Sequence, residues 1–333
     1  MPDAAPPITP EKSHPVVHAI ISNWRRLTGG KAVRDADRRT LIACSGGADS
    51  SALVLALATQ PASIVVAHIV HDMRPEADSA RCLDAARFLA ESIGVPFDSA
   101  RIEAKALGGN YEAAARGLRY AALEQLALRH GCRSIATAHH AEDQLETILL
   151  RLIRGTGPKG LAAIRAKRRL PSGLMVVRPM LSLTREQVRR LCRDCQWSWS
   201  EDASNADVSH KRAAIRAEVL PRLLEIEPQA ALRAVDAARL SLLAADHLGR
   251  AAGELARASE TADPERFDRA TLRSADRIVL LTWLRTLHAG ASFRVLDSIA
   301  RIVRSNSGEP REWSLGENTI RLTRDELCVR RKK

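Results

Sequence analysis

The sequence predicts an α/β fold, with a parallel doubly wound sheet of five strands followed by a helical C-terminal domain. Two observations support it. The first two-thirds of the chain alternate short apolar runs with helical patterns, which is typical of a parallel sheet covered by helices on both faces. From about residue 229 the chain is rich in Ala, Leu and Arg at helical spacing, which indicates a separate helical domain. The expected strands are 40–44, 63–70, 96–102, 133–138 and 174–179.

The remaining elements divide the chain into three parts. Helices are expected at 50–59, 76–94, 110–130 and 141–154, and a further helix begins near Thr184, with Thr184 or Ser182 as its N-cap. The pattern gives an N-terminal tail and first helix (1–35), a sheet domain (36–228) and a helical domain with a short C-terminal hairpin (229–333).

Charge and composition narrow the class of protein. The 333 residues carry a net charge of +12, which favours a polyanionic partner such as nucleic acid, although an arginine-rich genome would also produce it. Six cysteines are too few for a disulfide scaffold. No run reaches the roughly 20 apolar residues of a membrane span. The N-terminus lacks the apolar segment of a signal peptide. We therefore expect a cytoplasmic protein that does not contact membranes.

The stretch SGGADS lies between a buried strand and an apolar helix. Adjacent glycines let the backbone turn tightly and approach a ligand, and a helix N-terminus presents unpaired N–H groups that suit phosphate. An acidic side chain would repel bare phosphate, so we expect Asp49 to meet it through Mg²⁺. A plain capped turn is the alternative. The expected phosphate-binding residues are Ser45, Gly46, Gly47, Ala48, Asp49 and Ser50.

Two further segments carry polar side chains next to predicted strands. His71 follows the second strand, so it is expected at the carboxyl edge of the sheet, where such folds bind ligands. Arg116 and Arg119 lie three residues apart and are expected on one face of the helix at 110–130.

A cluster of histidine and acidic residues follows the fourth strand. His139, Asp143 and Glu146 have the spacing i, i+4, i+7, so we expect them on one helix face. Helix capping by the acidic residues is a simple alternative. Zinc binding is another, but no third and fourth ligands lie at the usual spacings.

Seven motifs in order between about residues 40 and 230 resemble those of the tRNA(Ile)-lysidine synthetase family, part of the PP-loop ATP-pyrophosphatase superfamily. Its Rossmann-like sheet agrees with the predicted fold. This chain departs from the family at Ala213, where an asparagine is usual, and at Met73, where a leucine is usual. The motifs are SGGADS, HIVHDMR, EAAARGLRY, AHHAEDQLET, RPMLSLTREQV, WSEDASNAD and HKRAAIRAEVLPRL.

The resemblance implies ATP-dependent ligation of free L-lysine to carbon 2 of the wobble cytidine of CAU-anticodon tRNA(Ile), through an adenylated cytidine. ATP and Mg²⁺ are the implied cofactors, and AMP and pyrophosphate the by-products. It implies that Arg116 lies near the α-phosphate and that Asp143, or secondly Glu146, binds lysine or accepts its proton. Arg212 is a further candidate for catalysis. The candidates for substrate binding are His71, His139 and Arg119.

The implied partners are the tRNA and free lysine, and a homodimer is left open. Arginines of the C-terminal domain and the cluster at 165–169 could hold tRNA phosphates. A PP-loop tRNA thiolase is the nearest alternative, and Cys192 and Cys195 form the C-x-x-C pair that it would use. The second alternative is a non-catalytic relative that binds RNA or nucleotide, and it is supported by Ala213 in place of the usual asparagine.

Overall fold

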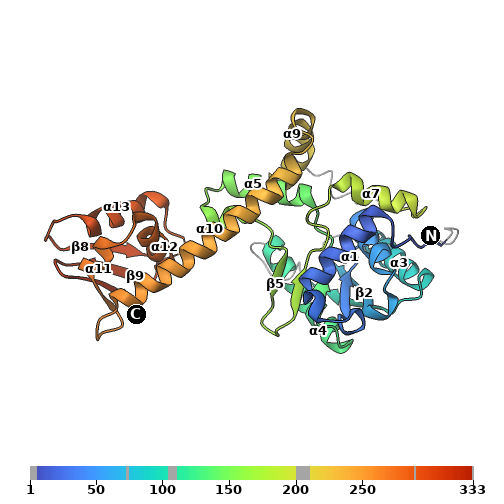
Figure 1. The fold of residues 1–333 in the computed structure, drawn as a ribbon, viewed down its shortest axis with the longest axis horizontal. Coiled ribbons are helices and arrows are strands. Elements are labelled where there is room, and N and C mark those ends of the chain that lie inside the picture. The colour runs from blue at the N-terminus through green and yellow to red at the C-terminus, as the bar shows by residue number, and fades with distance from the viewer. Residues whose placement is uncertain (1–5, 73–74, 104–110, 200–210, 289, 332–333) are drawn as a thin grey trace. The chain divides into compact units, whose positions relative to one another are not determined.

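The computed structural model describes residues 6–72, 75–103, 111–199, 211–288 and 290–331 (Figure 1). The chain divides into two compact units, Met1–Arg239 and Leu240–Lys333, whose boundary falls inside helix α10 (Ala230–Ser259). The three-part division expected from the sequence stays a prediction. Among the described residues, no helix is long and apolar enough to cross a membrane.

The first unit is built on a six-stranded sheet with the order β3-β2-β1-β4-β6-β5. Its five parallel strands confirm the five that the sequence predicts, and they begin or end within three residues of the expected bounds. Long apolar runs suit them because both faces of a parallel sheet are buried. The strands are β1 (Thr40–Ala43), β2 (Ile64–His71), β3 (Phe97–Ile102), β4 (Ser134–Ala136) and β6 (Met175–Val177).

The sixth strand, β5 (Lys167–Arg169), is absent from the sequence prediction. It pairs antiparallel with β6, so that Lys167 lies opposite Val177 and Arg169 opposite Met175. All three residues of β5 are exposed and basic. A charged edge strand has no apolar alternation to reveal it, and its charges discourage pairing with another chain.

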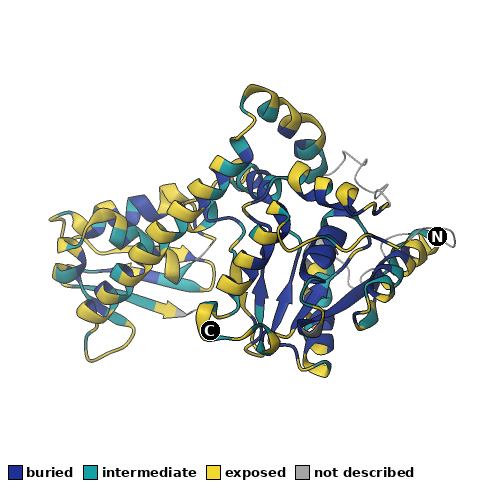
Figure 2. Cartoon of the chain, turned by 45° about the vertical axis from the view of Figure 1, so that its right-hand side comes forward, coloured by how far each residue is buried: buried dark blue, intermediate teal, exposed yellow. Residues whose placement is uncertain are grey.

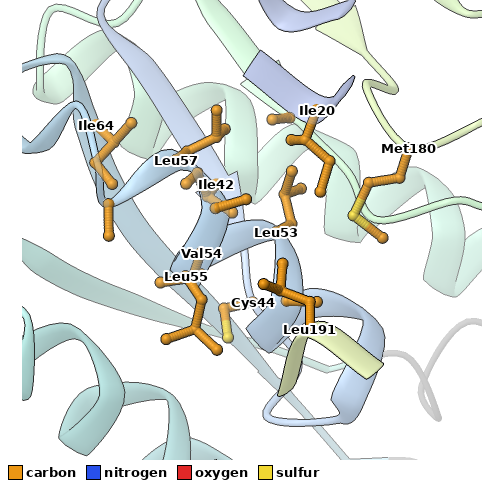
Figure 3. Close-up of a cluster of buried hydrophobic side chains, with 14 of the residues drawn as sticks. Ile20, Ile42, Cys44, Leu53, Val54, Leu55, Leu57, Ile64, Met180 and Leu191 are labelled. Carbon is orange, nitrogen blue, oxygen red and sulfur yellow. The ribbon is translucent and has the colours of Figure 1, made fainter. Parts of the chain in front are cut away.

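Two layers of helices enclose this sheet. One apolar cluster joins α1, α2, α3 and α7 to one face, and Figure 3 shows part of it around Ile42 and Leu53. Another joins α4 to the opposite face. Figure 2 shows β1 and β2 buried along almost their whole length. The helices are α1 (Pro15–Leu27), α2 (Ala48–Leu57), α3 (Glu76–Ser92), α4 (Tyr111–Arg129), α5 (Ala141–Ile153), α6 (Pro158–Leu161) and α7 (Arg185–Asp194).

The predicted helices between strands are confirmed, and Thr184 is the N-cap of α7, since its side chain accepts a hydrogen bond from the Gln187 amide. After the gap in the described residues, a third apolar cluster packs α5 against the chain from residue 215 onward. The elements here are α8 (Lys211–Ala214), a π-helical turn η6 (Ile215–Val219), α9 (Leu220–Ile226) and the start of α10.

The second unit contains more strand than the sequence suggested. The expected hairpin, β8 (Arg311–Leu315) and β9 (Asn318–Leu322), belongs to a four-stranded antiparallel sheet with the order β7-β10-β9-β8. Strands β7 (Arg266–Asp268) and β10 (Glu326–Arg331) pair across nearly sixty residues of sequence, which a local pattern cannot reveal. The helices are α11 (Arg269–Ser274), α12 (Arg277–Leu287) and α13 (Phe293–Arg304).

Candidate active site

The loop between β1 and α2 depends on one glycine. Gly46 has φ +82°, a conformation that L side chains rarely adopt. A Cβ placed on it would lie 2.7 Å from the backbone oxygen of Cys82 in α3. The loop therefore passes directly against the α3 backbone. Glycine is required at position 46 both for its backbone angle and for this close contact.

Ser50 holds the loop in shape. Its Oγ donates to the Gly47 carbonyl at 3.0 Å and accepts from the Ser45 amide at 3.0 Å. The hydroxyls of Ser45 and Ser50 lie 3.1 Å apart. Ser50 is buried, so these bonds are made away from bulk water. Its hydroxyl acts on the loop backbone, and the amides at the start of α2 are left for a ligand.

A pocket of about 340 Å³ opens beside this loop. This volume lies within the range of pockets that bind small ligands. Seven of the sequence-predicted site residues line it. They are Ser45, Asp49, Ser50, His71, Arg119, His139 and Asp143. Because β1, β2 and β4 end here, the pocket is at the carboxyl edge of the parallel sheet, where folds of this class bind ligands.

Asp49 is the residue that would hold a magnesium ion, whose charge would offset that of a phosphate. Its Oδ1 is buried and has no hydrogen-bond partner, while Oδ2 lies 3.6 Å from Nε2 of His140. Mg²⁺ usually takes one or two carboxylates, with phosphate and water completing its shell. Among the described residues, no group of three or more His, Cys, Asp or Glu side chains could hold a metal by itself, so the zinc alternative gains no support.

His140 is not among the site residues predicted from the sequence. It is buried, with Nδ1 3.0 Å from Glu142 Oε2 and Nε2 3.6 Å from Asp143 Oδ2. Burial lowers its pKa, but Asp143, Asp49 and Glu142 together raise the pKa of His140 to about 10. His140 is therefore a buried cation that holds carboxylates from α2 and α5 together. The spacing of three between His140 and Asp143 indicates part of this contact, whereas Asp49 comes from α2 and is brought to His140 only by the fold.

His139 is uncharged at neutral pH, unlike its neighbour His140. Burial and the positive charges of Arg178 and Arg116 lower the pKa of His139, despite the opposing attraction of Asp143. Its Nδ1 lies 3.0 Å from Thr137 Oγ1, which fixes the ring. His139 precedes α5, so the expectation that it shares a helix face with Asp143 and Glu146 is wrong. A neutral imidazole on the pocket wall can donate or accept a hydrogen bond.

Asp143 caps α5 and faces the pocket. Its Oδ2 accepts the His140 amide at 2.9 Å, and Oδ1 lies 3.6 Å from Nη2 of Arg216. The capping alternative is thus confirmed as one role of this side chain. Burial raises its pKa, but the charged His140, the hydrogen bond from the His140 amide and Arg216 outweigh burial and lower the pKa of Asp143. Asp143 is a stable carboxylate at neutral pH, suited to binding a cation.

Glu146 lies behind the pocket and holds two arginines. Its side chain is 1% exposed. Oε1 pairs with Nε of Arg212, and Oε2 accepts from Nε of Arg216 at 3.0 Å. Arg216 lines the pocket, whereas Glu146 and Arg212 are not among its lining residues. Ala213 leaves both ion pairs intact. Arg216 is not among the site residues predicted from the sequence, although its spacing of four residues from Arg212 favours a shared partner.

The other predicted residues do not line the pocket. Gly46, Gly47 and Ala48 form the turn into α2. Arg116 is exposed on α4, with its guanidinium 5.4 Å from the ring centre of Tyr120. The motif at 200–207, and Arg74 of the motif near the second strand, lie outside the described residues.

The chain is similar to known proteins along much of its length. The family model described as PP-loop domain matches residues 20–223, more than half of the chain. A tRNA(Ile)-lysidine synthase of Nostoc sp. is 37% identical over 247 residues, which are 73% of this chain and 69% of that protein. The chain belongs to the PP-loop tRNA(Ile)-lysidine synthase family. The resemblance found in its motifs is thereby confirmed.

Family members differ in how much of their length matches. The tRNA(Ile)-lysidine synthase of Thermus thermophilus is 42% identical over 196 residues, or 57% of this chain and 36% of that protein. The matched part of this chain thus covers about a third of the length of some relatives. A solved U34-tRNA thiolase from Methanococcus maripaludis, with its [4Fe-4S] cluster, matches 68% of this chain and 78% of its own, with a TM-score of 0.54 and 16% identity. That similarity concerns the fold alone.

Proposed function

We propose that this protein ligates free lysine to carbon 2 of the wobble cytidine of CAU-anticodon tRNA(Ile), using ATP and releasing AMP and pyrophosphate. One observation carries the proposal: a single pocket combines the PP-loop with the carboxylate of Asp143. A loop for pyrophosphate and an anionic site for an amine are the two requirements of this chemistry. The names of the related proteins support the same substrate.

The first step is adenylation of the cytidine. The O2 atom of the base attacks the α-phosphorus of ATP, the bond between the α- and β-phosphates breaks, and pyrophosphate leaves. Backbone amides at the start of α2 stabilise the leaving group. Mg²⁺, held by Asp49 and the phosphates, would neutralise part of the developing charge. Arg119, on the pocket wall, and the neighbouring Arg116 stabilise the charge on the α-phosphate.

The second step is attack of the lysine amine on carbon 2, with AMP as the leaving group. Lysine must bind as an ammonium ion and lose a proton before it reacts. The lowered pKa of Asp143 makes this carboxylate a good partner for the ammonium ion and a weak proton acceptor. We therefore assign Asp143 to lysine binding. Glu146 is already paired with Arg212 and Arg216, so we assign it to holding Arg216 at the pocket.

The test is transfer of labelled lysine to a CAU-anticodon tRNA(Ile) transcript. Loss of a charge-assisted hydrogen bond costs about 1.5–3 kcal/mol, so Asp143→Asn should raise KM for lysine by roughly 10- to 100-fold. ATP-dependent pyrophosphate release should persist. Asp84→Asn, an exposed carboxylate on α3, serves as the control. If the wild-type protein transfers no lysine, the proposed function is wrong. If Asp143→Asn keeps the wild-type KM, only the role of Asp143 fails.

The thiolase alternative needs reactive cysteines. Cys192 and Cys195 are buried in the core, and burial raises the pKa of their thiols to about 12 and about 11. Cys192 also donates its S–H to the Ala48 carbonyl at 3.3 Å. Both sulfurs therefore serve packing. Iron content of the purified protein separates the two functions directly.

A further inference from the structure

His68 is a buried polar side chain on the wall of the pocket. It lies on β2, is 5% exposed and lines the pocket together with Cys44 and Ser45. Neither step of the proposed reaction uses it. Its Nδ1 lies 2.8 Å from the carbonyl oxygen of Cys44, the residue immediately before the phosphate-binding loop. A carbonyl oxygen only accepts hydrogen bonds, so Nδ1 of His68 carries a proton and donates it.

This contact takes the place of strand pairing where β1 ends. The ladder between β1 and β2 ends with the pair Ala43 and Ala67, and the Cys44 amide still donates to the Ala67 carbonyl at 2.8 Å. Cys44 belongs to the apolar cluster drawn in Figure 3 and is 2% exposed, so its carbonyl needs a partner inside the protein. The imidazole of His68 supplies that partner. The chain can therefore leave the sheet at Cys44 without losing a buried hydrogen bond.

The Cys44 carbonyl and the Ser45 amide belong to one peptide group. A trans peptide group is planar and its oxygen and N–H point in opposite directions, so a bond at one end orients the other end. His68 holds the oxygen, and on the opposite side the Ser45 amide donates to Ser50 Oγ at 3.0 Å. Ser50 in turn donates to the Gly47 carbonyl at 3.0 Å. A continuous series of hydrogen bonds thus joins β2 to the turn at the start of α2.

We propose that His68 is a positioning residue for the phosphate-binding loop, acting through the peptide group of Cys44 and Ser45. The proposal rests on the proposed function, in which this loop binds ATP, and it adds a residue of β2 that holds the loop from outside. The hydrogen bond from His68 keeps the amides at the start of α2 aimed at the phosphates. Without this donor the peptide group can rotate, and the amides lose their alignment with the pyrophosphate that leaves.

Two amide substitutions distinguish the two ring nitrogens. The side-chain nitrogen of asparagine occupies the position of Nδ1, whereas that of glutamine reaches the position of Nε2. His68→Asn therefore keeps the donor to the Cys44 carbonyl, and His68→Gln removes it. The measurement is binding of ATP with Mg²⁺ to the full chain, without tRNA or lysine. We expect His68→Gln to raise the Kd roughly tenfold and His68→Asn to stay within about threefold of the wild type.

His130→Asn is the matched control. His130 is half-buried, and its Nε2 lies 2.8 Å from Oδ2 of Asp98, outside the pocket. The substitution also removes a hydrogen bond of a histidine, so it has a similar effect on stability. His130→Asn should bind ATP as the wild type does. A loss of affinity as large as that of His68→Gln would mean that general destabilisation explains both, and would overturn the proposal.

A double variant tests whether the effect passes through the peptide group. His68 and Ser50 hold its two ends, so loss of either bond frees the same group. The double variant with His68→Gln and Ser50→Ala should therefore bind ATP about as weakly as the weaker of the two single variants. Losses that multiply would show that the two side chains act separately, and would reject the proposed route.

NMR spectroscopy of nitrogen-labelled histidine side chains in the wild type gives a result independent of how any variant folds. The ring of His68 should carry a proton on Nδ1, and its absence there would overturn the proposal. Equal affinities of His68→Asn and His68→Gln would also overturn it. Failure of lysine transfer by the wild type would remove the proposed function, whereas ATP binding and the position of the ring proton judge His68 alone.

Discussion

The two parts of the pocket are held in place by different means. The loop Ser45–Ser50 is shaped by hydrogen bonds among its own residues, no more than five positions apart. Arg212 and Arg216 are instead fixed by Glu146, which lies 66 and 70 positions earlier in the chain. The phosphate-binding loop is therefore shaped mainly by its own residues. The side of the pocket that Arg216 lines forms only once distant segments have packed. Substitutions should affect the two halves differently.

The largest effect is expected at Gly46. Gly46→Ala forces the loop away from the Cys82 backbone, and a displacement of about 1 Å can cost roughly 100-fold in rate. Gly94→Ala is the matched control, because Gly94 has φ +67° but nothing within 4 Å of an added Cβ. Both variants carry backbone strain, and only the first carries the clash. Pyrophosphate release measures the difference, and comparable rates in the two variants would contradict the close contact.

A smaller effect is expected at Glu146. Glu146→Gln removes the carboxylate that Arg212 and Arg216 share, although Arg216 keeps its contact with Asp143. These arginines are 36% and 34% exposed, so solvent screening limits the cost to about 1–2 kcal/mol. We expect lysine transfer to fall about tenfold while pyrophosphate release changes less, since the loop is independent of Glu146. Glu186→Gln, which breaks the exposed pair with Arg193, should change neither rate. An equal loss of both steps would mean that the two halves are coupled.

The smallest effect is expected at Ser50. Ser50→Ala removes the hydroxyl that joins Ser45 to Gly47, and such a bond contributes about 1 kcal/mol. Neighbouring Ser51 is the control, because its buried hydroxyl has no hydrogen-bond partner and Ser51→Ala should be neutral or stabilising. Thermal unfolding and KM for ATP are the measurements. A greater loss from Ser51→Ala than from Ser50→Ala would show that the loop is held in another way.

The difference between contacts made within a short segment and contacts between distant segments also explains what could be predicted from the sequence. The loop and the buried strands were found because a few adjacent residues determine each of them. The spacing from Asp143 could indicate His140, but its contact with Asp49 arises only in the folded chain. Strand β7 was missed because its three residues are ordered by pairing with β10. Glu146 holds Arg216 at the pocket, and no local sequence pattern links these two positions.

Arg269 shows that not every arginine behind the net charge of +12 is available to bind a polyanion. This arginine is 4% exposed, and its guanidinium donates to six backbone carbonyls of the second unit, among them those of Ile302 and Thr323. Arg38 is similarly buried and donates to the carbonyls of Gly30 and Val33. Both count toward the isoelectric point, yet neither can reach a phosphate. The number of tRNA contacts inferred from a salt titration should therefore be smaller than the positive charge of the chain suggests.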